Sequence, residues 1–221
     1  MASITVENYL KAILLRTEGP EHIVPMGVLA EAMGVVPGTV TTMVKSLAEQ
    51  GLLDHQVRQG VRLTPAGRQV ALAVLRKHRL VETFLVRTLK MDWAEVHEEA
   101  EALEHAVSER VLARIDAFLG HPTTDPHGDP IPDAAGNLAE EVAGANLTTC
   151  ALNKPLRVTR ITDQSADFLE FVQKNGLKPG TRLRVVRREA ASGVLHCEIR
   201  AGGEIALGLP EAAKIAVGAI G

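Results

Sequence analysis

Hydrophobic positions in the first fifty residues recur at helical spacing in three short blocks. Ile4, Tyr9, Ile13 and Leu14 share one face of the first block, as residues three to four apart do on a helix. Glycine and proline separate the blocks and favour turns between them. The pattern therefore predicts three short helices, over residues 4–17, 25–33 and 37–50.

A β-hairpin and a long helix are predicted to follow. Residues 52–57 and 60–63 read as two short strands around a turn at 58–60. Thr64 and Pro65 then form a typical helix start, a capping hydroxyl followed by a first-turn proline, and the helix extends to about residue 89. Three helices and a hairpin in this order are typical of a winged helix-turn-helix.

The third helix is the expected DNA-reading element. Val40, Val44 and Leu47 make its buried face, while small polar residues at its start leave room to enter a major groove. Arginines on the hairpin are placed to reach phosphates. A winged helix that binds protein instead of DNA is the alternative. The expected DNA-binding residues are Pro37, Gly38, Thr39, Thr41, Thr42, Lys45, Arg58 and Arg62.

In the second half of the chain the pattern changes from helices to short β runs, from Pro155 onward. Two further helices, over about 92–107 and 108–119, precede a Pro-, Gly- and Asp-rich loop at 120–137. Four short β runs with one helix among them then indicate an SH3-like barrel. The expected fold is mainly α with a β-rich C-terminal part, in three domains: a winged helix-turn-helix (1–70), a helical metal-binding and dimerisation domain (71–145) and the SH3-like domain (146–221). The β runs are 156–161, 181–188, 194–200 and 204–209, and the helix is 166–175.

Charge is distributed unevenly along the chain. Residues 1–90 carry eleven Lys and Arg against seven Asp and Glu, residues 91–145 carry two against thirteen, and residues 146–221 carry eleven against seven. Acidic side chains crowded into the middle repel one another unless a positive charge lies among them. The two cysteines, Cys150 and Cys197, belong to no CxxC, so we expect free thiols. No signal peptide or long apolar run is evident, and a cytoplasmic location is expected.

Two ionisable residues interrupt the apolar stripe of the long helix. His78 and Glu82 lie four residues apart on the stripe formed by Ala71, Leu75, Leu85 and Leu89. Ionisable groups in an apolar stripe need a partner. They can pair with each other, or an imidazole and a carboxylate at this spacing can share a metal ion.

The following helix favours the metal interpretation. His97, Glu101, Glu104 and His105 lie at offsets 0, 4, 7 and 8, which places them on one flank of a helix. Val96, Ala100, Leu103 and Val107 form the adjacent apolar stripe. A cluster of carboxylates and imidazoles from two helices is self-repulsive when empty, and divalent cations would neutralise it. A solvated acidic helix with incidental histidines is the alternative.

These stretches resemble the diphtheria-toxin-repressor family, in particular its manganese transport regulator branch, in the full-length form with an SH3-like (FeoA-like) domain. The resemblance spans essentially the whole chain. It is carried by ENYL (7–10), RKHRLVE (76–82), VHEEAEALEHAVSERV (96–111) and PHGDPIP (126–132).

The resemblance implies two metal sites per subunit. The first would use Glu101, Glu104 and His105 together with Asn8, whose amide offers only a neutral oxygen. Lys11 stands where the manganese branch can carry a second glutamate, which disfavours a binuclear site. The second would use His78, Glu82 and His97, completed either by Gln164 and Asp167 or by the loop residues Asp125 and His127.

The expected function is a metal-dependent transcriptional regulator, a repressor of metal-uptake genes that binds operator DNA as a homodimer. All candidate ligands are oxygen or imidazole nitrogen, so Mn²⁺ is the expected ion and Fe²⁺ the alternative. A metal-dependent hydrolase and a winged-helix protein-interaction scaffold are the rival functions, although no general-base constellation remains once the ligands are assigned.

Overall fold

The computed structural model describes the chain except residues 1–2, 20, 139–143, 201–202 and 221. By its internal contacts the chain forms two compact units. The boundary falls within the long helix α4 (Pro65–Leu89), after His78. The first unit comprises residues 1–78, 104–108 and 132–138, and the second comprises 79–103, 109–131 and 139–221. No single described helix is long and apolar enough to cross a membrane; the bent pair α2 and α3 passes that test only by length and composition.

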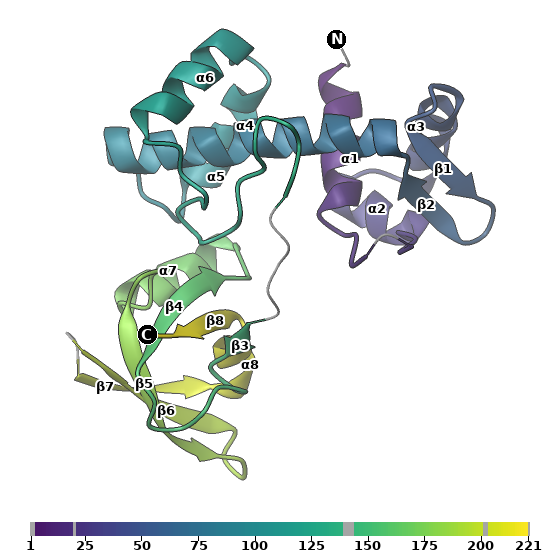
Figure 1. Ribbon diagram of the computed structural model, residues 1–221. Helices are drawn as coiled ribbons and strands as arrows, with labels where there is room; N and C mark the ends of the chain where they lie inside the picture. Colours follow the sequence, from purple (N-terminus) through teal and green to yellow (C-terminus); the bar gives the residue numbers. More distant parts are fainter. Residues whose placement is uncertain (1–2, 20, 139–143, 201–202, 221) are drawn as a thin grey trace. The chain divides into compact units, whose positions relative to one another are not determined.

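The first unit contains the predicted winged helix-turn-helix. Figure 1 shows α1, α2 and α3 with the hairpin beside the start of α4. Strands β1 and β2 pair antiparallel from Leu53↔Leu63 to Gln56↔Gly60, as the sequence predicts. Gly34 adopts φ +63° between α2 and α3, a left-handed conformation that glycine supplies without strain. The elements are α1 (Ile4–Leu14), α2 (Met26–Met33), α3 (Pro37–Glu49), β1 (Leu53–Gln56) and β2 (Gly60–Leu63).

The core of this unit follows the hydrophobic pattern with one exception. Tyr9, Ile13 and Leu14 of α1 are buried, but Ile4 is 58% exposed. Ile4 is the first residue of α1, and the helix ends at Leu14 rather than at residue 17. The buried face of α3, formed by Val40, Val44 and Leu47, is as predicted.

The helical part of the second unit contains the end of α4, most of α5 (Val96–Glu104), α6 (Glu109–Phe118) and the loop that follows. The α5 helix is shorter than expected: it begins at Val96 and ends before His105. Val96 and Ala100 are buried as predicted, whereas Leu103 is 39% exposed. Leu103 therefore lies outside the packed stripe, on a face that the described chain leaves to solvent.

A six-stranded antiparallel sheet completes the second unit, in the order β3-β8-β4-β5-β6-β7. The four predicted β runs and their helix are present. The short strand β3, helix α8 and strand β8 were not foreseen, because their few Ala- and Gly-rich residues give weak signals. The elements are β3 (Ala145–Asn146), β4 (Leu156–Ile161), α7 (Ala166–Lys174), β5 (Arg182–Glu189), β6 (Val194–Ile199), β7 (Gly203–Gly208), α8 (Leu209–Ala213) and β8 (Ile215–Ala219).

The core of this sheet domain includes Trp93, from the turn that precedes α5. Cys150 and Cys197 are buried within it as free thiols, as expected. Burial raises the pKa of Cys197 to about 12. The loop residue Gly128 (φ +92°) lies so close to β4 that a Cβ there would clash with the carbonyl oxygen of Thr159. Glycine at this position therefore lets the loop pack against the sheet.

Candidate metal centres and DNA-reading helix

The start of α3 presents the small polar surface that the sequence predicts. Pro37, Gly38 and Thr39 are exposed, as are Thr42 and Lys45, while Thr41 is half-buried. The Thr41 and Thr42 hydroxyls donate to carbonyl oxygens one turn earlier, Pro37 O at 2.9 Å and Gly38 O at 3.2 Å. Both hydroxyls are therefore bonded within the helix itself, to its own first turn.

The two predicted wing arginines differ in their surroundings. Arg58 lies exposed at the hairpin tip with φ +66°, and no ion-pair partner is found for it in the described part of the chain. Arg62 donates to Glu21 at 2.5 Å and to Asp54 at 2.9 Å. Two carboxylates already balance the Arg62 charge, so Arg58 is the better placed of the two to meet a phosphate.

The first cluster of titratable residues centres on Glu104, which is fully buried in the first unit. His78 Nδ1 lies 2.6 Å from Glu104 Oε2, and Lys11 Nζ donates to Glu104 Oε1 at 2.6 Å. Burial alone would raise the pKa of Glu104. The hydrogen bond with His78 and the charge of Lys11 outweigh it, and the pKa lies below its ordinary value. Glu104 is therefore an ionised carboxylate at neutral pH.

His105 connects this cluster to α1. Its Nε2 lies 2.8 Å from Asn8 Oδ1 and 3.2 Å from Glu104 Oε1, and its Nδ1 lies 2.7 Å from Glu7 Oε2. Asn8, Glu104 and His105 thus meet, as predicted. Sequence reasoning did not include Glu7 and Lys11 among the site residues. The helical spacing could have indicated them, because positions 7, 8 and 11 share one face of α1. The other faces of this helix bury Tyr9, Leu10 and Ile13.

Glu101 and His97 lie on α5 in the second unit. His97 is half-exposed, with Nε2 3.6 Å from Glu101 Oε1 and Nδ1 3.2 Å from Glu82 Oε1. The contact between His97 and Glu82 joins α5 to α4, as the offsets on the two helices imply. Glu82 itself is only 1% exposed.

A second cluster lies where the loop after α6 meets α4. Glu82, Asp125 and His127 are all buried, and each offers a ligand atom within 4.8 Å of the others. His127 Nε2 lies 2.9 Å from the Trp93 carbonyl oxygen, an acceptor that requires the proton on Nε2. Nδ1 then carries a bare lone pair, and it is buried with no hydrogen-bond partner among the described residues. An orphaned imidazole nitrogen beside two carboxylates fits a metal ligand set.

Asp125 is a residue of this cluster whose pKa is strongly shifted by its surroundings. Its Oδ1 accepts from the backbone N–H of His127 at 2.8 Å and of Asp129 at 2.9 Å, which shapes the loop. Burial, followed by the negative charges of Asp129 and Glu82, raises the pKa of Asp125 to about 7. Arg79 Nε, 3.7 Å from Asp125 Oδ2, offsets this only in part. A cation would relieve the remaining repulsion.

The two predicted ligands from the C-terminal domain are placed differently. The Gln164 side chain donates to Asp129 Oδ2, and Asp167 is exposed in the first turn of α7. Asp129, which sequence reasoning missed, also pairs with Arg160 Nε at 2.5 Å, so it fastens the loop to β4. Asp129 is only 2% exposed. Its burial could not be predicted, because the sequence pattern of a Pro- and Gly-rich loop does not indicate which side chains are buried.

Comparisons with known proteins show the family to which the chain belongs. Three family models match consecutive segments: the iron dependent repressor N-terminal DNA binding domain over residues 1–61, the iron dependent repressor metal binding and dimerisation domain over 64–133, and the FeoA domain over 145–218. The chain belongs to the iron-dependent repressor family. The C-terminal sheet is accordingly the family's SH3-like FeoA domain.

Relatives and solved structures support the same assignment across most of the chain. The chain is similar to the iron-dependent repressor IdeR of Mycobacterium tuberculosis, with 41% identity over 82% of this chain and 83% of that protein. It is 29% identical to the diphtheria toxin repressor of Corynebacterium diphtheriae, over 87% and 88%. Among solved structures, a manganese-dependent transcriptional repressor in complex with manganese matches at 42% identity and a TM-score of 0.85, covering 97% of this chain and all of that one.

Iron-dependent repressor family members bind operator DNA and dimerise, and they respond to iron or manganese. The chain is therefore a metal-dependent transcriptional repressor with a winged helix-turn-helix, and it is not an enzyme. This membership excludes the two rival functions predicted from the sequence, a metal-dependent hydrolase and a protein-interaction scaffold.

Proposed function

We propose that Mn²⁺ is the activating ion, with Fe²⁺ as the alternative, and that each subunit binds two ions. The donor sets carry the argument: both clusters offer only carboxylate and amide oxygens and imidazole nitrogens. Such ligands suit Mn²⁺, whereas thiolates or thioethers would favour softer ions. The match to a repressor whose structure contains manganese supports the same choice.

We assign Asn8, Glu104 and His105 to the first site; Glu101, which contacts His97 at 3.6 Å, stays a ligand predicted from the sequence alone. Glu104 and His105 come from the end of α5 and Asn8 from α1, so this site joins the DNA-reading domain to the metal-binding helix. We move His78, which the resemblance places in the second site, to this first site, since His78 contacts Glu104 at 2.6 Å. A bound divalent cation supplies the positive charge that holds these groups together. Lys11 occupies one lone pair of Glu104, which favours a single ion here.

We assign Glu82, Asp125 and His127 to the second site, with His97 as the partner of Glu82. The orphaned Nδ1 of His127 supports the loop, rather than Gln164 and Asp167, as the source of the completing ligands. Gln164 and Asp129 are not ligands in this assignment. Their contacts hold the loop against β4. For the exposed Asp167 no contact with this cluster is found in the described part of the chain, and it stays an alternative ligand.

We infer how metal binding would activate DNA binding from the elements that the first site connects. Glu7, Asn8 and Lys11 all lie on α1, which also packs in the core of the winged domain. Fixing α1 against the end of α5 fixes the orientation of α3, because α1 and α3 share that core. The population shifts toward a state in which two recognition helices of a dimer match successive major grooves. A tenfold gain in DNA affinity needs about 1.4 kcal/mol of coupling.

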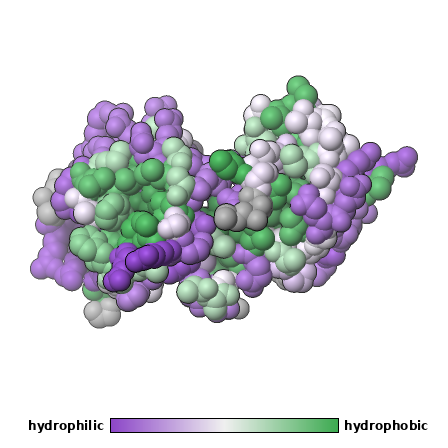
Figure 2. All heavy atoms as spheres, turned by 90° about the horizontal axis from the view of Figure 1, so that it is seen from above, coloured by the Kyte–Doolittle hydropathy of each residue, from purple (hydrophilic) through white to green (hydrophobic). Residues whose placement is uncertain are grey.

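We place the homodimer interface on the exposed apolar residues of α5 and α6. Leu103, Val111 and Phe118 are 39%, 50% and 69% exposed. Figure 2 shows hydrophobic residues gathered into one area of the helical part of the second unit. Exposed apolar area of this kind marks an interaction surface. Replacing Val111 with Glu should convert the dimer to a monomer in analytical ultracentrifugation, whereas Val57→Glu, at the exposed wing tip, should leave the dimer intact.

The decisive experiment measures binding to DNA from upstream of the protein's own gene and of metal-uptake genes. Fluorescence anisotropy is recorded anaerobically with EDTA, Mn²⁺ or Fe²⁺. We expect strong binding with Mn²⁺, weaker activation by Fe²⁺ and little binding in EDTA. Equal affinity with EDTA and with Mn²⁺ would exclude metal control. A lower activation midpoint for Fe²⁺ than for Mn²⁺ would overturn the choice of ion alone.

A further inference from the structure

The outer face of the C-terminal sheet carries a row of arginines that the metal and DNA sites do not use. Arg157 on β4 is opposite Arg182 on β5, and Arg200, just past β6, donates its backbone N–H to Arg182 O. All three side chains are exposed. The register therefore places three like charges side by side across neighbouring strands.

The charge of this row is not balanced within the described chain. Glu198 and the residue opposite it, Glu204, are acidic residues on the same face. The Glu198 carboxylate is engaged with Arg184, at 2.6 Å from Nη2 and 2.8 Å from Nε, and Glu204 Oε1 lies 3.3 Å from His196 Nδ1. For Arg157, Arg182 and Arg200 no carboxylate partner is found in the part of the chain that the structure describes. Like charges directly opposite one another destabilise a sheet. An oxyanion placed among them would reverse that cost.

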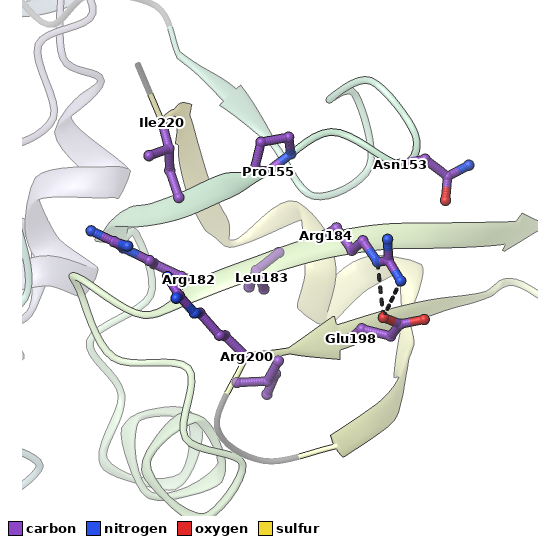
Figure 3. A pocket seen from close by; sticks show the side chains of 9 residues that line it. Asn153, Pro155, Arg182, Leu183, Arg184, Glu198, Arg200 and Ile220 are labelled. Atoms are coloured by element: carbon purple, nitrogen blue, oxygen red, sulfur yellow. Dashed lines mark hydrogen bonds and ion pairs between the residues drawn. The ribbon is translucent and has the colours of Figure 1, made fainter.

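Two residues of the row, Arg182 and Arg200, border a cavity of about 500 Å³. Figure 3 shows Arg182 and Arg200 side by side, extending to the same side and away from the Arg184–Glu198 pair. The cavity has an apolar part as well, formed by Pro155, Leu183, Ile199 and Ile220, with the Asn153 amide at one side. Arg182 and Arg200 also line an adjoining hollow of about 740 Å³. Small-molecule sites have this size and this mixture of apolar lining with a few polar groups.

We propose that this cavity is a binding site for a small organic oxyanion, a carboxylate or phosphate ester with an apolar body. The charged group lies between the guanidinium groups of Arg182 and Arg200, whose planar forks match carboxylate and phosphate oxygens. The apolar body lies against Pro155 and Ile220, the apolar lining residues that are not buried. The repressor thereby has a ligand site in its FeoA domain that is separate from both metal clusters.

The test uses the full-length protein in EDTA, titrated by calorimetry with phenyl phosphate, phenylacetate and inorganic phosphate. Phenyl phosphate should bind more tightly than inorganic phosphate, because only the ester fills the apolar part. Arg182→Gln and Arg200→Gln should each weaken phenyl phosphate binding about tenfold or more. Arg184→Gln is the matched control: it lines the same cavity, but Glu198 already balances its charge, so binding should change less than twofold.

A second readout separates ligand binding from damage to the fold. Without oxyanion, Arg182→Gln should melt at the same temperature as the unmodified protein or higher, since it relieves repulsion. With phenyl phosphate, only the unmodified protein and Arg184→Gln should gain stability. The proposal is overturned if no probe binds at 10 mM, or if all variants bind alike. It is also overturned if the Arg182 and Arg200 variants instead lower the salt dependence of operator binding, because the row would then contact DNA phosphates.

Discussion

Lys11 and Glu104, which are 93 positions apart in the chain, form a buried ion pair with a distance of 2.6 Å between Nζ and Oε1. The lysine side chain is 7% exposed and the glutamate side chain is not exposed at all. The pair connects α1 of the winged domain to the last residue of α5. It also places a covalently attached cation beside a carboxylate that we assign to the first metal site.

The first prediction concerns the number of ions that this site accepts. Lys11→Glu replaces the cation with an additional carboxylate, so we expect one more Mn²⁺ per subunit, measured by mass spectrometry of the metal after dialysis. Lys11→Met leaves a buried carboxylate without one partner and should destabilise the metal-free fold by about 3 kcal/mol. Lys90→Met is the control, because Lys90 is exposed and its hydrogen bond among the described residues is to the Arg87 carbonyl oxygen. An unchanged ion count in Lys11→Glu would contradict the role given to Lys11.

The second prediction concerns the loop ligands. His127→Ala removes the orphaned Nδ1 and should reduce the bound Mn²⁺ from two ions per subunit to one. His121→Ala is the matched control, because His121 lies in the same loop but is exposed and pairs with Asp116. If His127→Ala retains two ions and Asp167→Asn loses one, the C-terminal domain completes the second site instead.

The third prediction follows from the Asp125 pKa of about 7, above the ordinary value of 3.8 for this side chain. A carboxyl group with a raised pKa in the folded state binds its proton more tightly there than in the unfolded chain. In EDTA, protonation of Asp125 therefore stabilises the fold below about pH 4, and this stability is lost as the pH rises toward 7. The slope reaches at most about 1.4 kcal/mol per pH unit for one proton. Urea unfolding of Asp125→Asn should lack this slope; an identical pH profile would contradict the assignment.

The fourth prediction separates the two wing arginines. Arg58→Ala should reduce the slope of log K against log salt for operator binding by about 0.9, the value for one phosphate contact. Arg62→Ala should change it less, since Glu21 and Asp54 already hold the Arg62 charge. Anisotropy titrations from 50 to 200 mM salt provide both slopes. A larger effect for Arg62 would show that DNA displaces its carboxylate partners.

The fifth prediction concerns selectivity. Glu101→Cys replaces a hard anion with a thiolate, which softer ions prefer. Activation by Mn²⁺ should weaken more than activation by Fe²⁺ or Co²⁺, in anaerobic titrations of operator binding with each metal. Glu99→Cys is the control on an exposed turn of the same helix. If the ratio of Mn²⁺ to Fe²⁺ midpoints stays the same in Glu101→Cys, position 101 does not select the ion.

The sequence by itself determined the order of elements and the family. Helical and strand periodicities, glycine turns and the Thr64–Pro65 helix start are local signals, because they depend on neighbours a few residues away. For the same reason, the spacing of His78 and Glu82, and of His97 through His105, was readable as two polar flanks within apolar stripes.

Only the tertiary structure decided which groups meet. It placed Lys11 and Glu7 beside Glu104 and His105, and it left the Nδ1 of His127 buried without a described hydrogen-bond partner near Glu82. Such contacts join residues tens of positions apart, and a local pattern carries no information about them. Burial decides the chemistry too: a carboxylate such as Asp125 looks solvated in a Pro- and Gly-rich loop, yet removing it from water changes its charge state and its need for a cation.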